Sequence, residues 1–434
     1  MVGKASLLVV LGFSLIFLVF GQKFNSLSNQ SIDNMTDYYA QTVSHDCAVA
    51  GANMAANKVF LDPTWNTGFS NQSFNGGKFN TTVQLVDAFK NRIQITSVGA
   101  YAGVSHTVKV LLQPSSFSKF AYYSVSEGGT IWWTGGDTVW GPFHTQDYLR
   151  AHQHPVFVGK ATTKQGLVYY TNQKSDAPVF DGGYESGVNL PLSSAGLSPI
   201  KSDAKATGWD IPKSTITTTT YDTTYYTSGK SKGKIKNISS STTTSTDTAY
   251  ITFKKDSIQI KMGYNLPSTT YLTSTKTTDG VIYVEGMDVR LQGTVKGMYT
   301  IASEGNVWLD GDIVYNTDPL KNSNSKDLLG IVAQNDVWIT DNKANSKDIN
   351  IDAAIYTQTG SFGAQNYSAR GVDGNINLVG GITQNTRGAV GTFSGSNITS
   401  GFSKRYKYDN RLLVSSPPLF PGTGSFEVVS WLEE

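Results

Sequence analysis

The 434-residue chain has a single cysteine, Cys47, and no excess of charge of either sign, with 35 basic and 33 acidic residues. One cysteine cannot form an internal disulfide, so the fold must be held by packing and hydrogen bonds. The sequence also lacks a Lys/Arg cluster interleaved with aromatic residues, which argues against a nucleic-acid partner. A chain of this length can form two or three domains with cores of their own.

Charge is absent from residues 5–22, and proline is absent from everything before Pro63. The uncharged stretch is long enough to cross a membrane and is flanked by Lys4 and Lys23, so it predicts an apolar helix with basic ends. Because no proline interrupts it, the helix is expected to continue as an amphipathic helix over residues 23–57. At ~1.5 Å per residue, the whole helix is a rod of about 80 Å.

The two halves of this helix predict two contact surfaces. The first half is apolar on all sides, which suits lipid or a bundle of like helices. In the second half, apolar residues recur at a mean step of about 3.6, the period of one helix face, which suits docking onto a domain. The residues expected in a helix bundle or filament core are Leu7, Leu8, Val9, Val10, Leu11, Gly12, Phe13, Leu15, Ile16, Phe17, Leu18, Val19 and Phe20. The residues expected to pack on the body are Ile32, Met35, Tyr39, Val43, Cys47, Ala50 and Met54.

The rest of the chain is dominated by short β-branched and aromatic runs bounded by glycine or serine. Residues 59–138 predict a loop followed by a mostly antiparallel sheet that covers the second half of the helix. From residue 139 the strands are shorter, and over 279–316 the glycines are too closely spaced for helices between strands. Short and regular strands of this kind favour a right-handed parallel β-helix. A β-sandwich is the alternative, because no strict repeat length is visible.

Serine and threonine make up about half of residues 214–250. Thr and Tyr favour strands, so we predict a projecting hairpin insertion around 214–265 with a turn at 254–256; disorder is the alternative. A closing strand is expected at 426–431. The predicted fold is therefore mainly β with one long N-terminal α-helix. Its predicted domains are the helix at 1–58, a sheet domain at 59–138 and a β-helix-like domain at 139–434.

Few residues suggest chemistry. His144, His152 and His154 are close in sequence, but no carboxylate or thiol stands at a recognised ligand spacing beside them, so no metal site is predicted. Asp310 and Asp312 are oxygen donors of the kind that Ca²⁺ prefers, yet they lack the spacing of an EF-hand loop. Solvated turn aspartates are the preferred interpretation, with Ca²⁺ as the alternative.

Enzymatic activity is not expected. Parallel β-helices that cleave polysaccharides use paired carboxylates, or a carboxylate and a base, in a groove. Asp310 and Asp312 are the only close carboxylate pair in the predicted solenoid, and no base accompanies them. We therefore predict neither a catalytic residue nor a cofactor.

The N-terminal layout, MVGKASLLVVLGFSLIFLVF running into an amphipathic helix and then a β domain, resembles that of type IV pilins and of the larger minor pilins of pilus assembly. The resemblance implies insertion in the inner membrane, processing by a prepilin peptidase and polymerisation through helices packed in a filament core. Pilins usually carry Glu at the fifth mature position. If Met1 is the first mature residue, Ala5 stands there, which favours a minor subunit or a divergent filament.

Two functions follow. The first is a structural subunit of an extracellular, cell-surface filament of the type IV pilus kind. Its partners would be copies of itself and, before polymerisation, the inner-membrane assembly machinery. The alternative is a membrane-anchored adhesin or carbohydrate-binding β-helix protein, in which aromatic residues such as Trp132 and Trp133 would stack on sugars.

Overall fold

The computed structural model describes residues 2–87, 92–129, 131–192, 196–264, 266–394 and 397–434. The chain forms two compact units, the first made of residues 1–114 and 425–434 and the second of residues 115–424. Most of the regular structure is strand, and one long helix leads the chain. The predicted class, mainly β with one long N-terminal α-helix, is confirmed.

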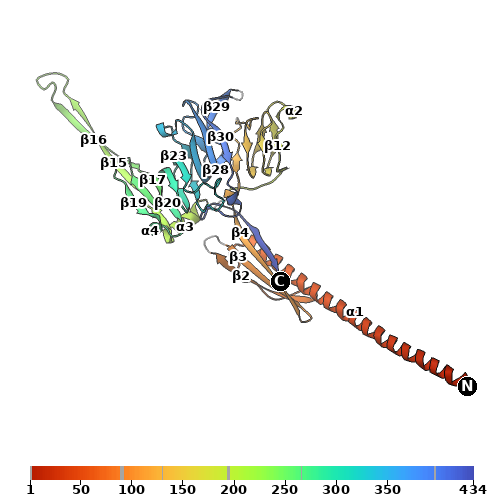
Figure 1. Cartoon of the computed structure of the whole chain (residues 1–434). Coiled ribbons are helices and arrows are strands. Elements are labelled where there is room, and N and C mark those ends of the chain that lie inside the picture. Colours follow the sequence, from red (N-terminus) through yellow and green to blue (C-terminus); the bar gives the residue numbers. More distant parts are fainter. Residues whose placement is uncertain (1, 88–91, 130, 193–195, 265, 395–396) are drawn as a thin grey trace. The chain divides into compact units, whose positions relative to one another are not determined.

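Helix α1 runs without interruption from Val2 to Leu61. It ends where the sequence predicts, just before Pro63, since the residue ahead of a proline avoids the helical conformation. The Asp62 carboxylate closes the end by accepting hydrogen bonds from the Thr64 backbone N–H at 3.0 Å and the Thr64 hydroxyl at 2.7 Å. Figure 1 shows the N-terminal part of α1 extending away from strands β2, β3 and β4.

The sheet of the first unit covers one face of the second half of α1. Its strand order is β1-β2-β3-β4-β31, and β1 to β4 pair antiparallel. Side chains alternate along β2 and β3, and the inward ones form a core with alanines of the helix. The predicted antiparallel sheet on the helix is therefore present. The strands are β1 (Phe69–Phe74), β2 (Gly77–Asp87), β3 (Arg92–Tyr101), β4 (Val104–Ser116) and β31 (Gly422–Glu433).

The second unit is built on parallel ladders of short strands. The longest ladder joins ten strands, each hydrogen-bonded in parallel to the next. In order along the ladder they are β14 (Trp209–Ile211), β20 (Val281–Val284), β22 (Met298–Ser303), β24 (Leu328–Ala333), β26 (Ile349–Thr357), β28 (Val372–Thr386), β5 (Tyr122–Ser126), β7 (Phe143–Thr145), β10 (Ala161–Thr163) and β13 (Tyr184–Ser186).

Other parallel pairings run beside this ladder. One set joins β17 (Thr248–Lys255), β21 (Asp288–Val295), β23 (Val307–Tyr315), β25 (Val337–Ile339) and β27 (Phe362–Ala364), and β28 also pairs with β30 (Asn397–Lys407). A second set joins β6 (Thr138–Val139), β9 (Val156–Phe157) and β12 (Val179–Phe180), and a third joins β8 (Tyr148–Ala151) and β11 (Gly166–Tyr169).

The ladder register stacks buried apolar side chains into one column. Successive partners are Ile282, Ile301, Ile331, Ile355, Ile382, Tyr122, Phe143 and Ala161. All eight are buried. The column joins the last long strand of the ladder to the first strand of the unit, because Ile382 on β28 is the partner of Tyr122 on β5. Residues 260 positions apart are thereby neighbours in one core.

Antiparallel hairpins branch from these ladders. The threonine-rich segment forms the hairpin β15 (Thr215–Tyr225) and β16 (Ile235–Thr246), which Figure 1 shows extending away from the other strands of its unit. A second hairpin joins β17 to β18 (Ser257–Met262), with its turn where the sequence predicts it. Strand β19 (Thr269–Leu272) continues that pairing, and β29 (Gly391–Ser394) pairs with β30. The short helices are η1 (Phe117–Lys119), α2 (Gln173–Asp176), α3 (Ser198–Ala206), α4 (Thr273–Lys276), η2 (Lys343–Asn345) and η3 (Asn410–Leu413).

The division into units differs from the predicted boundary between residues 138 and 139. Residues 115–138 belong to the second unit, because β5 pairs with β28 and Trp133 is buried in the core of that unit. The C-terminal strand instead belongs to the first unit. The Glu434 backbone bonds reciprocally with that of Thr107, at 2.8 and 2.9 Å. Local composition could not reveal either assignment, since both depend on partners far away in the sequence.

The buried carboxyl group of Asp352 in the second unit is expected to make the stability of the protein depend on pH. Burial raises the pKa of Asp352 to about 6, with smaller contributions from Asp318 and Asp409, and a 2.8 Å hydrogen bond from the Tyr315 backbone N–H opposes the shift. Because this pKa lies above the usual value, the native protein keeps a proton that the unfolded chain releases between about pH 4 and 6. The contribution of Asp352 to the free energy of unfolding therefore falls as the pH rises from about 4 to 6.

Asp352→Asn is consequently expected to stabilise the protein at pH 7 by about 1–3 kcal/mol and to change its stability little at pH 4. The asparagine oxygen still accepts the hydrogen bond from Tyr315, so only the ionisation is removed. Urea unfolding of both proteins at the two pH values measures the difference. An equal difference at both pH values would show that ionisation of Asp352 is not responsible.

Candidate functional site

The first half of α1 exposes a continuous apolar surface, here called the apolar segment and defined as Ala5–Gln22. Every residue from 3 to 39 is exposed. Twelve of the thirteen residues predicted for a helix bundle are large and apolar, and their exposed fractions lie between 52% and 73%. The thirteenth is Gly12. An exposed apolar surface of this extent is unfavourable in water, so it requires lipid or another apolar surface as a neighbour.

The backbone of this segment needs no partner outside the helix, because each interior N–H bonds to a carbonyl one turn earlier. The Ser6 hydroxyl also bonds within the helix, donating to the Gly3 carbonyl at 3.1 Å. Lys4 and Lys23 mark the ends of the uncharged stretch. Among the described residues, α1 is one helix that is long and apolar enough to cross a membrane.

Small residues interrupt the apolar segment. A β-carbon at Gly12 or Gly21 would have no heavy atom of another part of the chain within 4 Å. Ser6 and Ser14 add two further small side chains on the exposed helix. Small residues allow two helix backbones to approach closely in an apolar environment, so these positions offer grooves to a neighbouring helix.

The second half of α1 packs on the sheet, but through a different stripe from the predicted one. Val43 and Cys47 are buried as expected, and Ala50 is half-buried. The prediction is wrong for Ile32, Met35, Tyr39 and Met54, which are exposed by 60%, 77%, 57% and 43%. Tyr39 still makes an edge-on contact with Tyr101 at 5.8 Å between ring centroids. The buried stripe is Ala40, Val43, Ser44, Cys47, Ala48, Gly51, Ala52, Ala55 and Val59.

The small-residue stripe faces the sheet because the backbones of α1 and β3 approach each other closely. Gly99 on β3 has no side chain, and a β-carbon there would lie 2.1 Å from the Ser44 carbonyl oxygen. The helix therefore presents its small residues to the sheet, whereas the larger Met54 lies outside the contact. The repeat of Ala48, Gly51, Ala52 and Ala55 is the sequence signal of this contact, but the larger apolar residues share the same period and mask it.

Cys47 is fully buried, and its thiol donates to the Phe74 carbonyl at 3.2 Å. Burial raises the pKa of this thiol, and the nearby Asp46 carboxylate adds to the effect. A raised pKa disfavours the reactive thiolate. Cys47 is therefore a packed small residue, as the sequence predicts.

The residues considered for Ca²⁺ have partners within the chain. Asp310 accepts from the Arg290 Nε at 2.9 and 3.1 Å and from the Thr340 hydroxyl at 2.8 Å. Asp312 accepts from the Asn350 backbone N–H at 2.9 Å. Within the described residues, no group of three or more His, Cys, Asp or Glu side chains is arranged to hold a metal ion.

His144 and His154 lie in different environments. His144 is buried, donates to or accepts from the Thr162 hydroxyl at 2.7 Å, and stacks on Tyr123 with 5.3 Å between ring centroids. Burial lowers the pKa of His144 to about 4, so the ring is neutral at pH 7. His154 instead contacts the Ala177 carbonyl at 2.8 Å.

Comparison with known proteins finds likeness among solved structures and not among sequences. No protein-family model and no curated protein sequence matches the chain. Among solved structures, the chain is similar to the competence-associated pilin ComZ from Thermus thermophilus. The sequence identity is 12% and the TM-score 0.35, with 91% of this chain and 97% of that chain covered.

The fold joins one long helix to β-rich structure. One helix carries an exposed apolar first half, and its second half is packed on an antiparallel sheet that precedes a further β unit. The helix thus joins an apolar surface, which none of the described residues covers, to a folded body.

Proposed function

We propose that the protein is a structural subunit of an extracellular, type IV pilus-like filament, in which copies associate through the apolar segment of α1. The observation that carries this proposal is the high exposure of twelve large apolar side chains on a helix whose second half is packed into a folded unit. Identical segments from other copies would remove that surface from water. The same segment would hold the subunit in the inner membrane, next to the assembly machinery, before polymerisation.

The shape of the segment supports helix–helix contact. Gly12 and Gly21 leave open space between large side chains, which a neighbouring helix can occupy. A contact that joins different surfaces of successive copies does not close, so it propagates into a helical polymer. The two units would then lie on the cell-surface filament as its β-rich part.

We further propose that the second unit is a parallel β-helix. The ladder from β14 to β13 and the stacked column of buried side chains support this architecture. Parallel pairing of this extent does not suit the antiparallel β-sandwich that was the alternative. In this role the unit is a surface scaffold, and we propose no catalytic function and no cofactor for it.

A charge placed in the apolar segment tests whether this segment holds the filament together. Gly12→Lys is expected to abolish filaments seen by electron microscopy of the protein purified from its native host. A Lys at the centre of an apolar helix costs roughly 3 kcal/mol, and every subunit of the filament would bear that cost. The circular dichroism spectrum is expected to stay unchanged, because a β-carbon at position 12 would have no heavy atom of another part of the chain within 4 Å.

Two control variants accompany this experiment. Gly12→Ala keeps the segment uncharged, and Ser31→Lys adds the same charge at an exposed position of α1 outside the segment. Both are expected to give normal filaments. Normal filaments from Gly12→Lys would contradict the proposal. Membrane-bound wild-type monomers without filaments would instead favour the membrane-anchored adhesin.

A further inference from the structure

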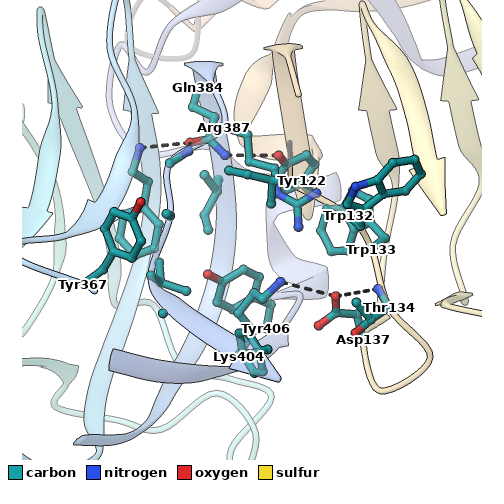
Figure 2. Close-up of a pocket in the computed structure, with 18 of the residues that line it drawn as sticks. Tyr122, Trp132, Trp133, Thr134, Asp137, Tyr367, Gln384, Arg387, Lys404 and Tyr406 are labelled. Atoms are coloured by element: carbon teal, nitrogen blue, oxygen red, sulfur yellow. Dashed lines mark hydrogen bonds and ion pairs between the residues drawn. The ribbon is translucent and has the colours of Figure 1, made fainter. Parts of the chain in front are cut away.

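The second unit contains a pocket of about 420 Å³ that brings together two distant parts of its sequence. Residues 122–170 form one side and residues 362–406 the other, and the pairing of β5 with β28 holds them together. Its volume falls within the range of small-molecule sites, about 300–1,000 Å³. Figure 2 shows Trp132 and Tyr367 on opposite sides of the pocket.

A buried cation in this pocket has an unused hydrogen-bond donor. Arg387 donates through Nη1 to Glu127 Oε2 at 2.9 Å, and its side chain is only 4% exposed. Its other terminal nitrogen, Nη2, has no hydrogen-bond partner among the described residues. Buried donors of this kind are rarely left unpaired, so a ligand oxygen is the expected acceptor.

A second cation lines the same pocket. Lys404 Nζ lies 3.3 Å from Asp137 Oδ2, and its side chain is 15% exposed. Both cations lie over the Trp133 ring, with Arg387 Cζ at 4.1 Å and Lys404 Nζ at 5.3 Å from its centroid. Asp137 lies in the pocket wall and the fully buried Glu127 lies behind it, so each cation already has one carboxylate partner. The unpaired Nη2 donor of Arg387, with Lys404 as a second cation in the same wall, favours an anionic group beside Arg387.

Aromatic side chains form the remaining walls. Trp132 contacts Tyr170 with 5.1 Å between ring centroids, and His152 lies 4.5 Å from the Tyr170 ring. Tyr170 and Tyr367 are exposed by 60% and 37%. Flat apolar rings at a pocket mouth, combined with fixed polar groups inside, suit a ligand that has both an apolar face and polar edges.

We propose that this pocket binds a carboxylated sugar, such as a uronic acid residue of an acidic polysaccharide. Its carboxylate would accept from Arg387 Nη2 and lie near Lys404, as carboxylates pair with guanidinium groups. Its ring would lie between the aromatic walls, and the exposed rings at the mouth would contact neighbouring sugar units. The site lies wholly within the second unit, so the proposal does not depend on filament formation.

A nucleic acid is another anionic ligand that could contact the two cations of the pocket. Binding of nucleic acid depends on several cations that contact successive phosphates. The pocket has two cations, both partly neutralised by carboxylates, and the net charge of the chain is only +2. These observations favour one carboxylate over a phosphate backbone.

Isothermal titration calorimetry of the full chain in detergent tests the proposal with hexagalacturonic acid as the probe. The expected result is saturable binding that weakens as NaCl is raised, with at least tenfold weaker binding of a neutral galactose hexamer. Trp132→Ala is expected to weaken binding of the acidic probe at least tenfold. Lys404→Met is expected to weaken it several-fold and to reduce its dependence on salt.

Trp338→Ala is the matched control, because Trp338 stacks on Trp308 elsewhere in the same unit. It is expected to bind like the wild type. Arg387→Gln is less suitable as a test of binding, since it leaves the Glu127 carboxylate buried without its cation and would destabilise the fold. Absence of binding by the wild type, equal binding of the neutral hexamer, unchanged binding by Trp132→Ala, or tighter binding of a single-stranded oligonucleotide would each overturn the proposal.

Discussion

Glu127→Gln is expected to destabilise the second unit by about 3–5 kcal/mol, because it leaves the buried Arg387 without its counter-charge. Glu127 is fully buried and accepts four side-chain hydrogen bonds. Besides Arg387, the Trp133 Nε1 and the Tyr122 hydroxyl each donate to it at 2.9 Å. An amide replaces one acceptor oxygen by an NH₂ group, so at least one of these donors also loses its partner.

Urea unfolding and amide exchange of the peptides that contain β5 and β28 would measure this loss. Those two strands are expected to be affected together, because Glu127 follows β5 directly and Arg387 follows β28 directly. The double variant Glu127→Gln/Arg387→Gln is expected to recover part of the stability, since it removes the unpaired charge.

Glu185→Gln is the control for this prediction. Glu185 pairs with Lys160 at 2.6 Å on the surface, where the two side chains are 53% and 62% exposed. Exposed ion pairs contribute only about 0–1 kcal/mol, so this change is expected to have little effect. If Glu127→Gln were as stable as Glu185→Gln, the buried ion pair would not hold the two parts of the unit together.

Gly99→Ala is expected to destabilise the first unit by about 3 kcal/mol. A β-carbon at position 99 would lie 2.1 Å from the Ser44 carbonyl oxygen and 2.3 Å from the Ala48 nitrogen. Both are backbone atoms of α1, so the clash cannot be relieved by rotation of a side chain. Gly51 on the helix is also closely packed, although against side chains, since a β-carbon there would lie 2.4 Å from the Ser97 hydroxyl oxygen and 2.6 Å from the Phe79 ring. The helix would have to move off the sheet.

Labelling of Cys47 measures directly how often the helix opens from the sheet, because Cys47 is the single cysteine of the chain and is buried in this interface. Its buried thiol reacts with a maleimide when the helix opens from the sheet. A loss of about 3 kcal/mol corresponds to roughly a hundredfold faster labelling in Gly99→Ala. Ala100→Val enlarges the adjacent, exposed position and is expected to label at the wild-type rate. Equal labelling rates in Gly99→Ala and Ala100→Val would show that the close approach is not required.

The two proposals assign different roles to different parts of the chain. The apolar segment of α1 would place the subunit in a filament, and the pocket of the second unit would then present a sugar-binding site on it. The pocket of Arg387 and Lys404 could not be found from the sequence. Trp132 and Trp133 were the only members that suggested sugar contact, and Arg387 stands more than 250 positions after them.

The sequence by itself determined the helix and the class of the fold. The absence of charge over residues 5–22 and of proline before Pro63 allows one continuous helix, since both depend only on local chemistry. The richness in Thr and Tyr likewise favours the exposed hairpin of β15 and β16.

The tertiary structure alone decided which face of α1 packs on the sheet and which strands are neighbours. Two adjacent stripes of the helix share the period of 3.6, and the close approach at Gly99 and Gly51 favours the one made of small residues. Strands of three or four residues are too short to show a period, and the pairing of β5 with β28 joins residues 260 positions apart. Such pairing depends on the packing energy of the assembled ladder, which no local pattern of residues contains.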